Sequence, residues 1–335
     1  MEKSTWFLGV DVSKEKLDLT LQKGPEKVDY RAIENNPTSI RAYFRVLKTE
    51  LKVALPECLV CMEYTGIYNN HLLQVGQKLG LKIWIESAAS IKLSTGVSRI
   101  KNDKIDSYKI AMYAFRFQDK AKLWEKPRKV ILLLDLYSKR REKLVKIKHM
   151  LDVGKKDNLI FLDKDIAKEV DVYQPLLKKI EELIKKIDAK IDTLINGDAQ
   201  IKELAKIITS VPGVGKVTAV KMIVTTKEFK DINDPRKYAC YGGVAPFERT
   251  SGSSIKGKTQ VSKKANLSVK TLLSLCAGSA INHDPEIRAF YERKLAEGKH
   301  KMSVRNAVKN KIIHRVFAYV NQNRLYEKNY QSALA

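Results

Sequence analysis

Apolar side chains in the first 126 residues recur in short runs and at a period of two, a pattern typical of β-strands. The segments that predict strands lie at residues 7–12, 17–21, 28–32, 58–63 and 82–85. Longer amphipathic segments predict helices at residues 37–51, 68–79 and 103–117. Strands that alternate with helices predict an α/β domain over residues 1–126.

The middle of the chain, residues 127–208, changes to a helical pattern. A basic helix is predicted at residues 130–151, and residues 154–165 separate it from a second helix. The apolar residues of this second helix recur every three or four positions: Leu176, Ile180, Leu183, Ile187, Ile191 and Leu194. Two long helices joined by a loop predict either a protruding coiled coil or an ordinary helical bundle, and the pattern fits both.

The last region, residues 209–335, is predicted to be mainly helical, with helices at residues 263–281 and 304–320. Its segment VPGVGK has the form of a helix-hairpin-helix. There, Gly213 and Gly215 would let backbone amides approach a phosphate, and Lys216 would open the next helix. Such a hairpin binds the nucleic-acid backbone without reading its sequence. A glycine-rich turn between two helices would use the same residues, so both interpretations stay open.

The charge of the chain indicates its partner. Its 335 residues carry 63 Lys+Arg against 38 Asp+Glu, a formal net charge of +25. Residues 209–335 hold 23 Lys+Arg and 9 Asp+Glu, which is +14 of that total. A polyanion is needed to offset such self-repulsion, and nucleic acid is the natural one. An anionic membrane surface is the alternative, but no stretch approaches the ~18 apolar residues of a membrane span.

Targeting signals and cysteines add little to this picture. The N-terminal segment has no secretory apolar core, so we expect a cytoplasmic protein. Four cysteines are too few for a disulfide framework at this length. Cys58 and Cys61 form a CxxC pair inside an apolar run, which favours buried strand cysteines over a zinc site.

Four acidic residues form a candidate metal site. Asp11 and Glu63 end predicted strands, and Asp103 and Asp106 lie three residues apart on one helical face. Mg²⁺ takes oxygen ligands, and two such ions can stabilise the attacking and leaving oxygens of a phosphodiester displacement. The alternative is that each carboxylate caps a helix or is a solvated surface charge. Four carboxylates that converged would need cations to compensate them.

The contexts of these acids, VDVSK, EYTGIY and KNDKIDS, stand in the order and spacing of a known family. The sequence resembles the DEDD transposases of insertion sequences, relatives of the Piv-type DNA invertases, over nearly the whole chain. The resemblance implies a RuvC-like N-terminal domain with a ribonuclease-H fold and a mixed sheet. It also implies that Asp11, Glu63, Asp103 and Asp106 bind a divalent metal, Mg²⁺ or Mn²⁺. Ser107 departs from the alanine that the family often has there.

A glycine- and serine-rich segment in the C-terminal region carries the second candidate site. Six basic residues and no acidic one lie from Arg249 to Lys270, which predicts a flexible basic loop. Chemistry alone does not choose among its serines, because the nearest histidine, His283, lies 32 residues beyond Ser251. In the family, the essential serine precedes a glycine and follows a G-x-x-P segment, here residues 243–246. The resemblance thus implies that Ser251 attacks DNA and forms a covalent phosphoserine link.

Basic residues in the last region are candidate nucleic-acid contacts. Those around the serine are Arg249, Lys256, Lys258, Lys263 and Lys264. Those that follow, with one aromatic residue among them, are Tyr291, Lys294, Lys299, Lys301, Arg305, Lys309 and Arg315. Any one of them alone would more often be a solvated surface charge, and only the cluster indicates backbone binding.

Three functional interpretations remain. The first is a recombinase of donor and target DNA, for which the resemblance further implies guidance by a structured bridge RNA and a homo-oligomer, a dimer or tetramer. The second is a RuvC-like junction-resolving nuclease that uses metal-activated water. The third is a non-enzymatic nucleic-acid-binding protein. The pattern along the chain divides it into residues 1–126, a coiled-coil region at 127–208 and residues 209–335. The resemblance implies that the first region is a metal-binding domain and the last a transposase domain.

Overall fold

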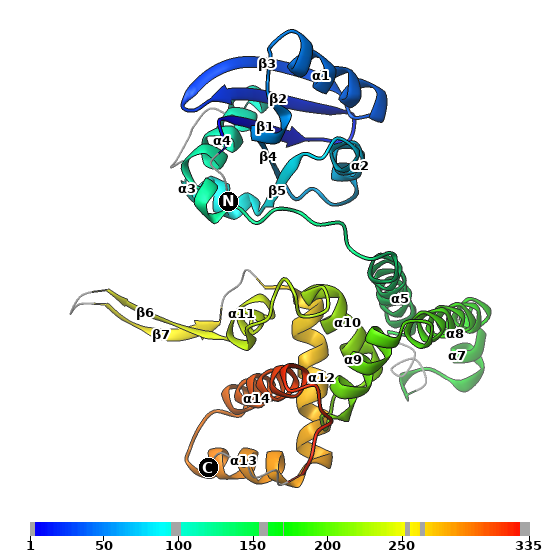
Figure 1. Ribbon diagram of the computed structural model, residues 1–335. Helices are drawn as coiled ribbons and strands as arrows, with labels where there is room; N and C mark the ends of the chain where they lie inside the picture. Colours follow the sequence, from blue (N-terminus) through cyan, green and yellow to red (C-terminus); the bar gives the residue numbers. More distant parts are fainter. Residues whose placement is uncertain are drawn as a thin grey trace. The chain divides into compact units, whose positions relative to one another are not determined.

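The computed structural model describes residues 4–94, 102–153, 160–169, 171–251, 255–261 and 265–328, with the backbone alone at 167, 248–251 and 255–260. It divides into two compact units, Met1–Lys126 and Pro127–Ala335 (Figure 1).

The first unit is built on a five-stranded mixed sheet with the order β3-β2-β1-β4-β5. The strands are β1 (Trp6–Val12), β2 (Lys16–Lys23), β3 (Glu26–Glu34), β4 (Cys58–Glu63) and β5 (Lys82–Glu86). β2 is antiparallel to β1 and β3, whereas β4 is parallel to β1 and β5. All five strands predicted from the sequence are present, and the expected mixed sheet is confirmed.

Helices cover both faces of this sheet (Figure 1). On one face, α1 (Pro37–Thr49) and α2 (Asn70–Lys78) pack against the alternating apolar residues of β1 and β2. On the other face lie α3 (Ala88–Ser94) and α4 (Asp103–Arg116). Short 3₁₀ turns are η1 (Leu55–Glu57), η2 (Gly66–Asn69) and η3 (Gln118–Lys120). Cys58 and Cys61 are buried in β4 without a disulfide, as predicted.

A glycine sets the distance between α4 and the sheet. A Cβ on Gly9 would lie 2.2 Å from the Ser107 carbonyl oxygen and 2.3 Å from the Ala111 amide nitrogen. The helix backbone therefore rests directly on β1, where only glycine fits. Next to this contact, the Ser107 hydroxyl lies 2.8 Å from that of Thr20, and both side chains are buried. The serine that departs from the family pattern thus has a hydrogen-bond partner.

The described residues of the second unit are helical apart from the strands of one hairpin. α5 (Lys129–Asp152) and α8 (Gln174–Asn196) pack side by side, joined by ion pairs such as Arg141–Asp188 at 2.6 Å. α7 (Lys164–Glu169) precedes α8. The predicted apolar stripe is divided, because Ile180 and Ile191 are buried whereas Leu176 and Leu183 are 48% and 39% exposed. The coiled coil stays a prediction.

The later helices in the described part of this unit are α9 (Ala199–Ser210), α10 (Lys216–Thr226), α11 (Pro235–Tyr241), α12 (Leu267–His283), α13 (Pro285–Ala296) and α14 (Lys301–Asn321). A single apolar core runs from Leu134 of α5 through Ile223 of α10 to Phe317 of α14. The helices predicted as a separate central region therefore share their core with the C-terminal helices.

The basic segment around Ser251 is a β-hairpin and not the flexible loop that its glycines and serines suggested. Strand β6 (Pro246–Ser251) pairs antiparallel with β7 (Ile255–Val261). Both strands contain β-branched residues, including Thr250 and Ile255, which favour extended backbone. Charge and glycine content had masked this strand propensity.

Candidate active site

Two predicted carboxylates lie at the ends of neighbouring parallel strands. Val10 of β1 pairs with Met62 of β4, so Asp11 and Glu63 follow at the same level of the sheet. Side chains alternate along a strand, and Asp11 therefore shares with Gly9 the face that α4 covers. The strands thus direct both acids towards the start of α4.

Helix α4 supplies the other two predicted carboxylates. Asn102 caps it by accepting a hydrogen bond from the Lys104 amide at 3.0 Å, and Asp103 and Asp106 occupy its first turn. Acidic side chains there interact favourably with the helix dipole. Because Gly9 lets the helix rest on β1, this turn lies near the end of that strand.

The electrostatics show that the four acids share one environment. Burial raises the pKa of Asp11 to about 6, helped by the charges of Asp103, Glu63 and Asp106. Burial also raises the pKa of Glu63, with a contribution from Asp106. Both shifts follow from removing carboxylates from water and placing them beside like charges. Asp103, Glu63 and Asp106 therefore lie within electrostatic reach of Asp11.

A fifth acid, Asp18, was not predicted. It pairs with Asp11 across β1 and β2, is 2% exposed, and its charge also raises the pKa of Asp11. Its oxygens lie 2.6 Å from the Tyr30 hydroxyl, which donates to it, and 3.2 Å from Lys16 Nζ. The strand's alternation could have placed Asp18 on the face of Asp11, but not beneath a helix.

Lysines offset part of this negative charge. Lys16 Nζ lies 2.6 Å from an Asp103 oxygen, and Lys109 Nζ lies 3.0 Å from Asp106. Hydrogen bonds to Asp103 and Asp18 raise the pKa of Lys16. Within the described ranges, no three acidic, histidine or cysteine side chains are already arranged around a common point as metal ligands. The donor set consists of carboxylate oxygens, which fits a hard divalent cation, while lysines hold two of the acids.

Two buried asparagines position the loops around the acids. Asn69 donates to the Glu63 carbonyl oxygen at 2.9 Å and accepts from the Thr65 amide at 2.7 Å. Asn35 donates to the carbonyl oxygens of Ser13 and Tyr68, at 2.8 Å and 3.0 Å. It thereby joins the loop after Asp11 to the loop after Glu63. Nothing in the sequence pattern distinguished these asparagines from ordinary turn residues.

For Ser251, the predicted nucleophile in the hairpin, the structure describes the backbone alone. Ser251 ends β6 and pairs with Ile255 of β7. Arg249 pairs with Gly257 and Lys256 with Thr250, while Lys258 lies within β7. Lys263 and Lys264 lie outside the described residues.

The helix-hairpin-helix glycines have different environments. Gly213 has a φ of +84°, and a Cβ there would lie 2.6 Å from the Cys276 carbonyl oxygen of α12. This position requires glycine for packing, which is the structural alternative. Gly215 is exposed at the start of α10, and a Cβ there would meet no atom within 4 Å. A role in phosphate binding therefore remains open for Gly215.

Most of the predicted basic contacts whose side chains are described are neutralised internally. Lys216 pairs with Asp192 at 2.6 Å, and Lys294 and Lys299 pair with Glu297 at 2.7 Å and 3.8 Å. Arg315 pairs with Asp284 and Glu286. Arg305 and Lys309, by contrast, have no carboxylate within 4 Å among the described side chains. The sequence pattern did not separate these two groups.

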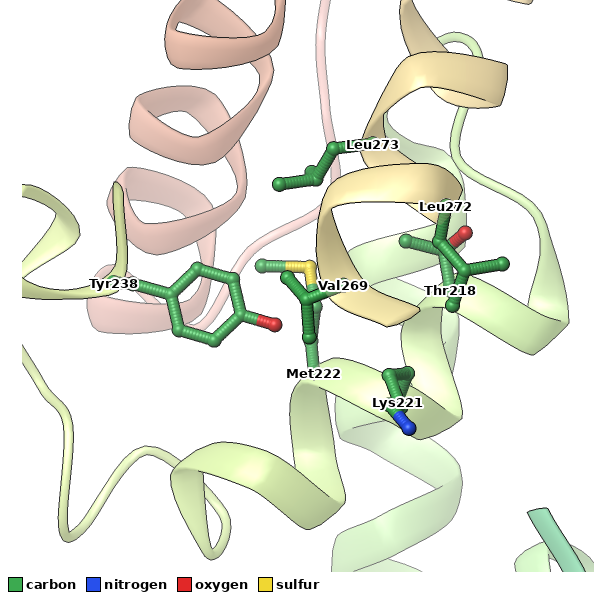
Figure 2. A pocket seen from close by; sticks show the side chains of 7 residues that line it. All are labelled: Thr218, Lys221, Met222, Tyr238, Val269, Leu272 and Leu273. Atoms are coloured by element: carbon green, nitrogen blue, oxygen red, sulfur yellow. The ribbon is translucent and has the colours of Figure 1, made fainter. Parts of the chain in front are cut away.

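Two pockets in the second unit are lined by residues other than the four acids. Figure 2 shows the first, where Met222, Tyr238, Val269 and neighbouring side chains of the second unit's core gather closely. The second is a groove of about 490 Å³ between α5, α8, α10 and α12, and of the predicted site residues Lys216 lines it.

No helix among the described ranges is long and apolar enough to cross a bilayer.

Comparisons with known proteins cover both candidate sites. A DEDD family model described as "Transposase" matches residues 8–150, which include the four predicted carboxylates. A second model, "Transposase IS116/IS110/IS902 family", matches residues 205–292, which include Ser251.

Similar curated proteins include the insertion element IS110 uncharacterized 43.6 kDa protein of Streptomyces coelicolor, 29% identical over 47% of this chain and 39% of the relative. The pilin gene-inverting proteins of Moraxella bovis and Moraxella lacunata are each 25% identical over 43% of this chain and 45% of the relative. The chain thus spans less than half the length of these relatives.

Among solved structures, T. thermophilus RuvC in complex with a Holliday junction substrate matches with a TM-score of 0.27 and 13% identity, over 36% of this chain and 99% of that one. A score this low carries no argument. The family assignment rests instead on the two models, which match the segment of the carboxylates and the segment of the serine. Over these two segments the chain is similar to insertion-sequence transposases of the DEDD and IS116/IS110/IS902 families.

Proposed function

We propose that the protein is a DNA transposase that cuts and rejoins strands through a covalent link to Ser251, assisted by divalent metal at the acidic cluster. The observation that carries this proposal is the gathering of Asp11, Glu63, Asp103 and Asp106 at one end of the sheet, in a chain with a net charge of +25. A protein that only bound phosphate would gain nothing from clustered acids, since they repel it.

The chemistry proposed for Ser251 is a transesterification. Its Oγ forms a bond to phosphorus, one backbone P–O bond breaks, and the hydroxyl proton ends on the departing oxygen. Because the phosphodiester energy is kept in the Oγ–P bond, the reverse attack can rejoin a strand. Divalent ions bound by the carboxylates would supply positive charge to the attacking and leaving oxygens. We propose Mg²⁺ or Mn²⁺ as these ions.

The decisive experiment is mass spectrometry of a trapped protein–DNA adduct. We expect a phosphoserine at residue 251, loss of the adduct in Ser251→Ala, and its retention in the matched control Ser253→Ala. Suppose instead that cleavage leaves free DNA ends, persists in Ser251→Ala and disappears in Asp11→Asn. The protein would then be a metal-dependent nuclease and not a recombinase. Binding that needs neither residue nor metal would favour a non-enzymatic role.

We further propose that a structured bridge RNA guides the protein, that donor and target DNA are its substrates, and that it works as a homo-oligomer. The excess positive charge supports a nucleic-acid partner but does not distinguish RNA from DNA. Sequencing the nucleic acid that copurifies with the protein tests the RNA. Recovery of no discrete RNA species would overturn that part of the proposal.

A further inference from the structure

Three cations in the second unit gather without a counter-ion. Arg305 and Lys309 are four residues apart on α14 and therefore share a face, and α12, which carries Lys270, packs against this helix. Arg305 extends across α12, because its Nη2 lies 3.4 Å from where a Cβ on Gly278 would be. Burial lowers the pKa of Lys309, and the charges of Lys270 and Arg305 lower it further.

What is unusual is that the most buried of these charges has no partner. Lys309 is only 6% exposed. Within the described part of the chain, no side chain forms an ion pair or hydrogen bond with the charged group of Lys270, Arg305 or Lys309. Buried charges are normally paired, because desolvation is costly. A cluster of like charges around a lysine that lies largely out of water therefore favours the binding of an anion.

Another cation of the same helix provides a comparison. Arg315, six residues beyond Lys309, is also largely buried, and its guanidinium lies 2.7 Å from Asp284 and 2.6 Å from Glu286. The fold thus supplies carboxylates where a cation of α14 has a structural role. At Lys309 it supplies two more cations.

The cluster lies at the base of the β6–β7 hairpin. Asn306, next to Arg305, donates to the Val244 carbonyl oxygen at 2.6 Å, two residues before β6 begins. Asn266, one turn before Lys270, donates from its amide to the Tyr241 carbonyl oxygen at 2.9 Å and from its side chain to the Tyr241 hydroxyl at 2.7 Å. Both helices that carry the cations are thus tied to the segment that leads into the serine hairpin.

We propose that Lys270, Arg305 and Lys309 form a binding site for one phosphate group of a nucleic-acid backbone, which anchors the strand at the base of the hairpin that carries Ser251. A phosphodiester would bring a negative charge to these three neighbouring cations, and a guanidinium can donate two parallel hydrogen bonds to its oxygens. This inference rests on the proposed nucleic-acid function and adds to it a defined anchoring point.

The test uses the full-length protein, freed of nucleic acid at high salt, with DNA and RNA strands of equal length. In Lys309→Met, which keeps the aliphatic stem, we expect about tenfold weaker affinity and a salt dependence whose slope is lower by about 1. The melting temperature should stay equal or rise, because a like-charge repulsion is removed. The matched control is Lys311→Met, two residues away and paired with Glu286 at 3.7 Å, which should change neither property.

Whichever of DNA and RNA loses affinity identifies the source of the phosphate. Sulfate, used as a free anion, should stabilise the wild type more than Lys309→Met. Unchanged affinity and salt slope for both nucleic acids would overturn the proposal, even if the sulfate effect were lost. If Lys309→Met failed to fold, the half-buried Lys270→Met would decide in the same assays. The Ser251 adduct is measured separately, so failure of the recombinase chemistry and failure of this site are distinguishable.

Discussion

Each unit holds a cluster of like-charged side chains, acidic in the first unit and basic in the second. Each cluster would be stabilised by a ligand of opposite charge. In the first unit, carboxylates gather around Asp11 and raise its pKa to about 6, with burial the larger cause. In the second unit, Lys270 and Arg305 lie around a buried Lys309 and lower its pKa, again with burial the larger cause. Like charges held together destabilise the isolated protein, which is a common cost of a functional site. The comparison indicates a cation as the missing ligand of one cluster and a phosphate as that of the other.

The clusters differ in how far the protein compensates them. Lys16 and Lys109 reach two of the acids in the first unit, whereas the three cations of the second unit have no acid among the described side chains. A lysine can leave a carboxylate when a divalent ion arrives, since both are cations. The acidic cluster is therefore partly neutralised until its ligand binds, while the basic cluster depends entirely on its ligand.

The largest effect is expected from Asp11→Asn, which removes a charged carboxylate from the acidic cluster of the first unit. Strand cleavage should fall by at least about a hundredfold, because a buried carboxylate at the centre of the cluster is lost. The metal-free protein should melt at a higher temperature at pH 7, because the repulsion felt by Asp11 is removed. Cleavage assays and thermal unfolding check the two parts. If Asp11→Asn lowered the melting temperature, the view of this cluster as a destabilising functional site would be wrong.

Gly9 lies beside the acidic cluster and Gly278 beside the basic one. The same substitution, glycine to alanine, therefore compares the stability of packing at the two clusters. Gly9→Ala should destabilise the first unit by about 1–3 kcal/mol or more, because the new Cβ meets the rigid backbone of α4 at 2.2 Å. Gly278→Ala should be neutral or stabilise by up to about 1 kcal/mol, since its new Cβ meets only the flexible end of Arg305 at 3.4 Å.

Urea unfolding monitored in both variants measures these changes. Loss of divalent-metal binding should accompany Gly9→Ala, because α4 carries two of the acids. Equal destabilisation by the two substitutions would contradict the claim that α4 packs backbone to backbone on β1.

The sequence predicted those features that depend on local pattern. Strand ends were visible in the alternation of apolar residues, so Asp11 and Glu63 could be placed, and family motifs added Asp103 and Asp106. Asp18 could not be recognised, because a polar residue in an alternating strand usually faces water, whereas this one is buried in the folded unit. Lys309 was predicted as a surface contact for the same reason. Burial of a charge is a tertiary property, and it is burial that distinguishes both residues.

The β6–β7 hairpin is a case in which the local sequence pattern gave the wrong prediction. Glycine and serine around Ser251 indicated a loop, while the pairing of β6 with β7 depends on cross-strand contacts that a single strand does not reveal. The internal ion pair of Lys216 was hidden similarly, because Asp192 lies 24 residues from this lysine and only folding brings the two together.

The smallest effect, but the most specific one, is the pH dependence of metal binding at the acidic cluster. The folded pKa of Asp11, about 6, lies above its ordinary value of 3.8, so between these pH values the folded protein binds more protons than the unfolded chain. Stability of the metal-free protein from this group is therefore highest below pH 3.8 and declines as the pH rises to about 6. A divalent ion needs the ionised carboxylate, so its affinity should rise about fivefold from pH 5 to pH 6, about twofold more by pH 7, and level off above that. The increase in melting temperature caused by Mn²⁺ should accordingly be larger at pH 7 than at pH 5, and Asp11→Asn should abolish this difference. A Mn²⁺ effect of equal size at both pH values would mean that the ion binds without displacing a proton from Asp11, and hence that this carboxylate is not a ligand.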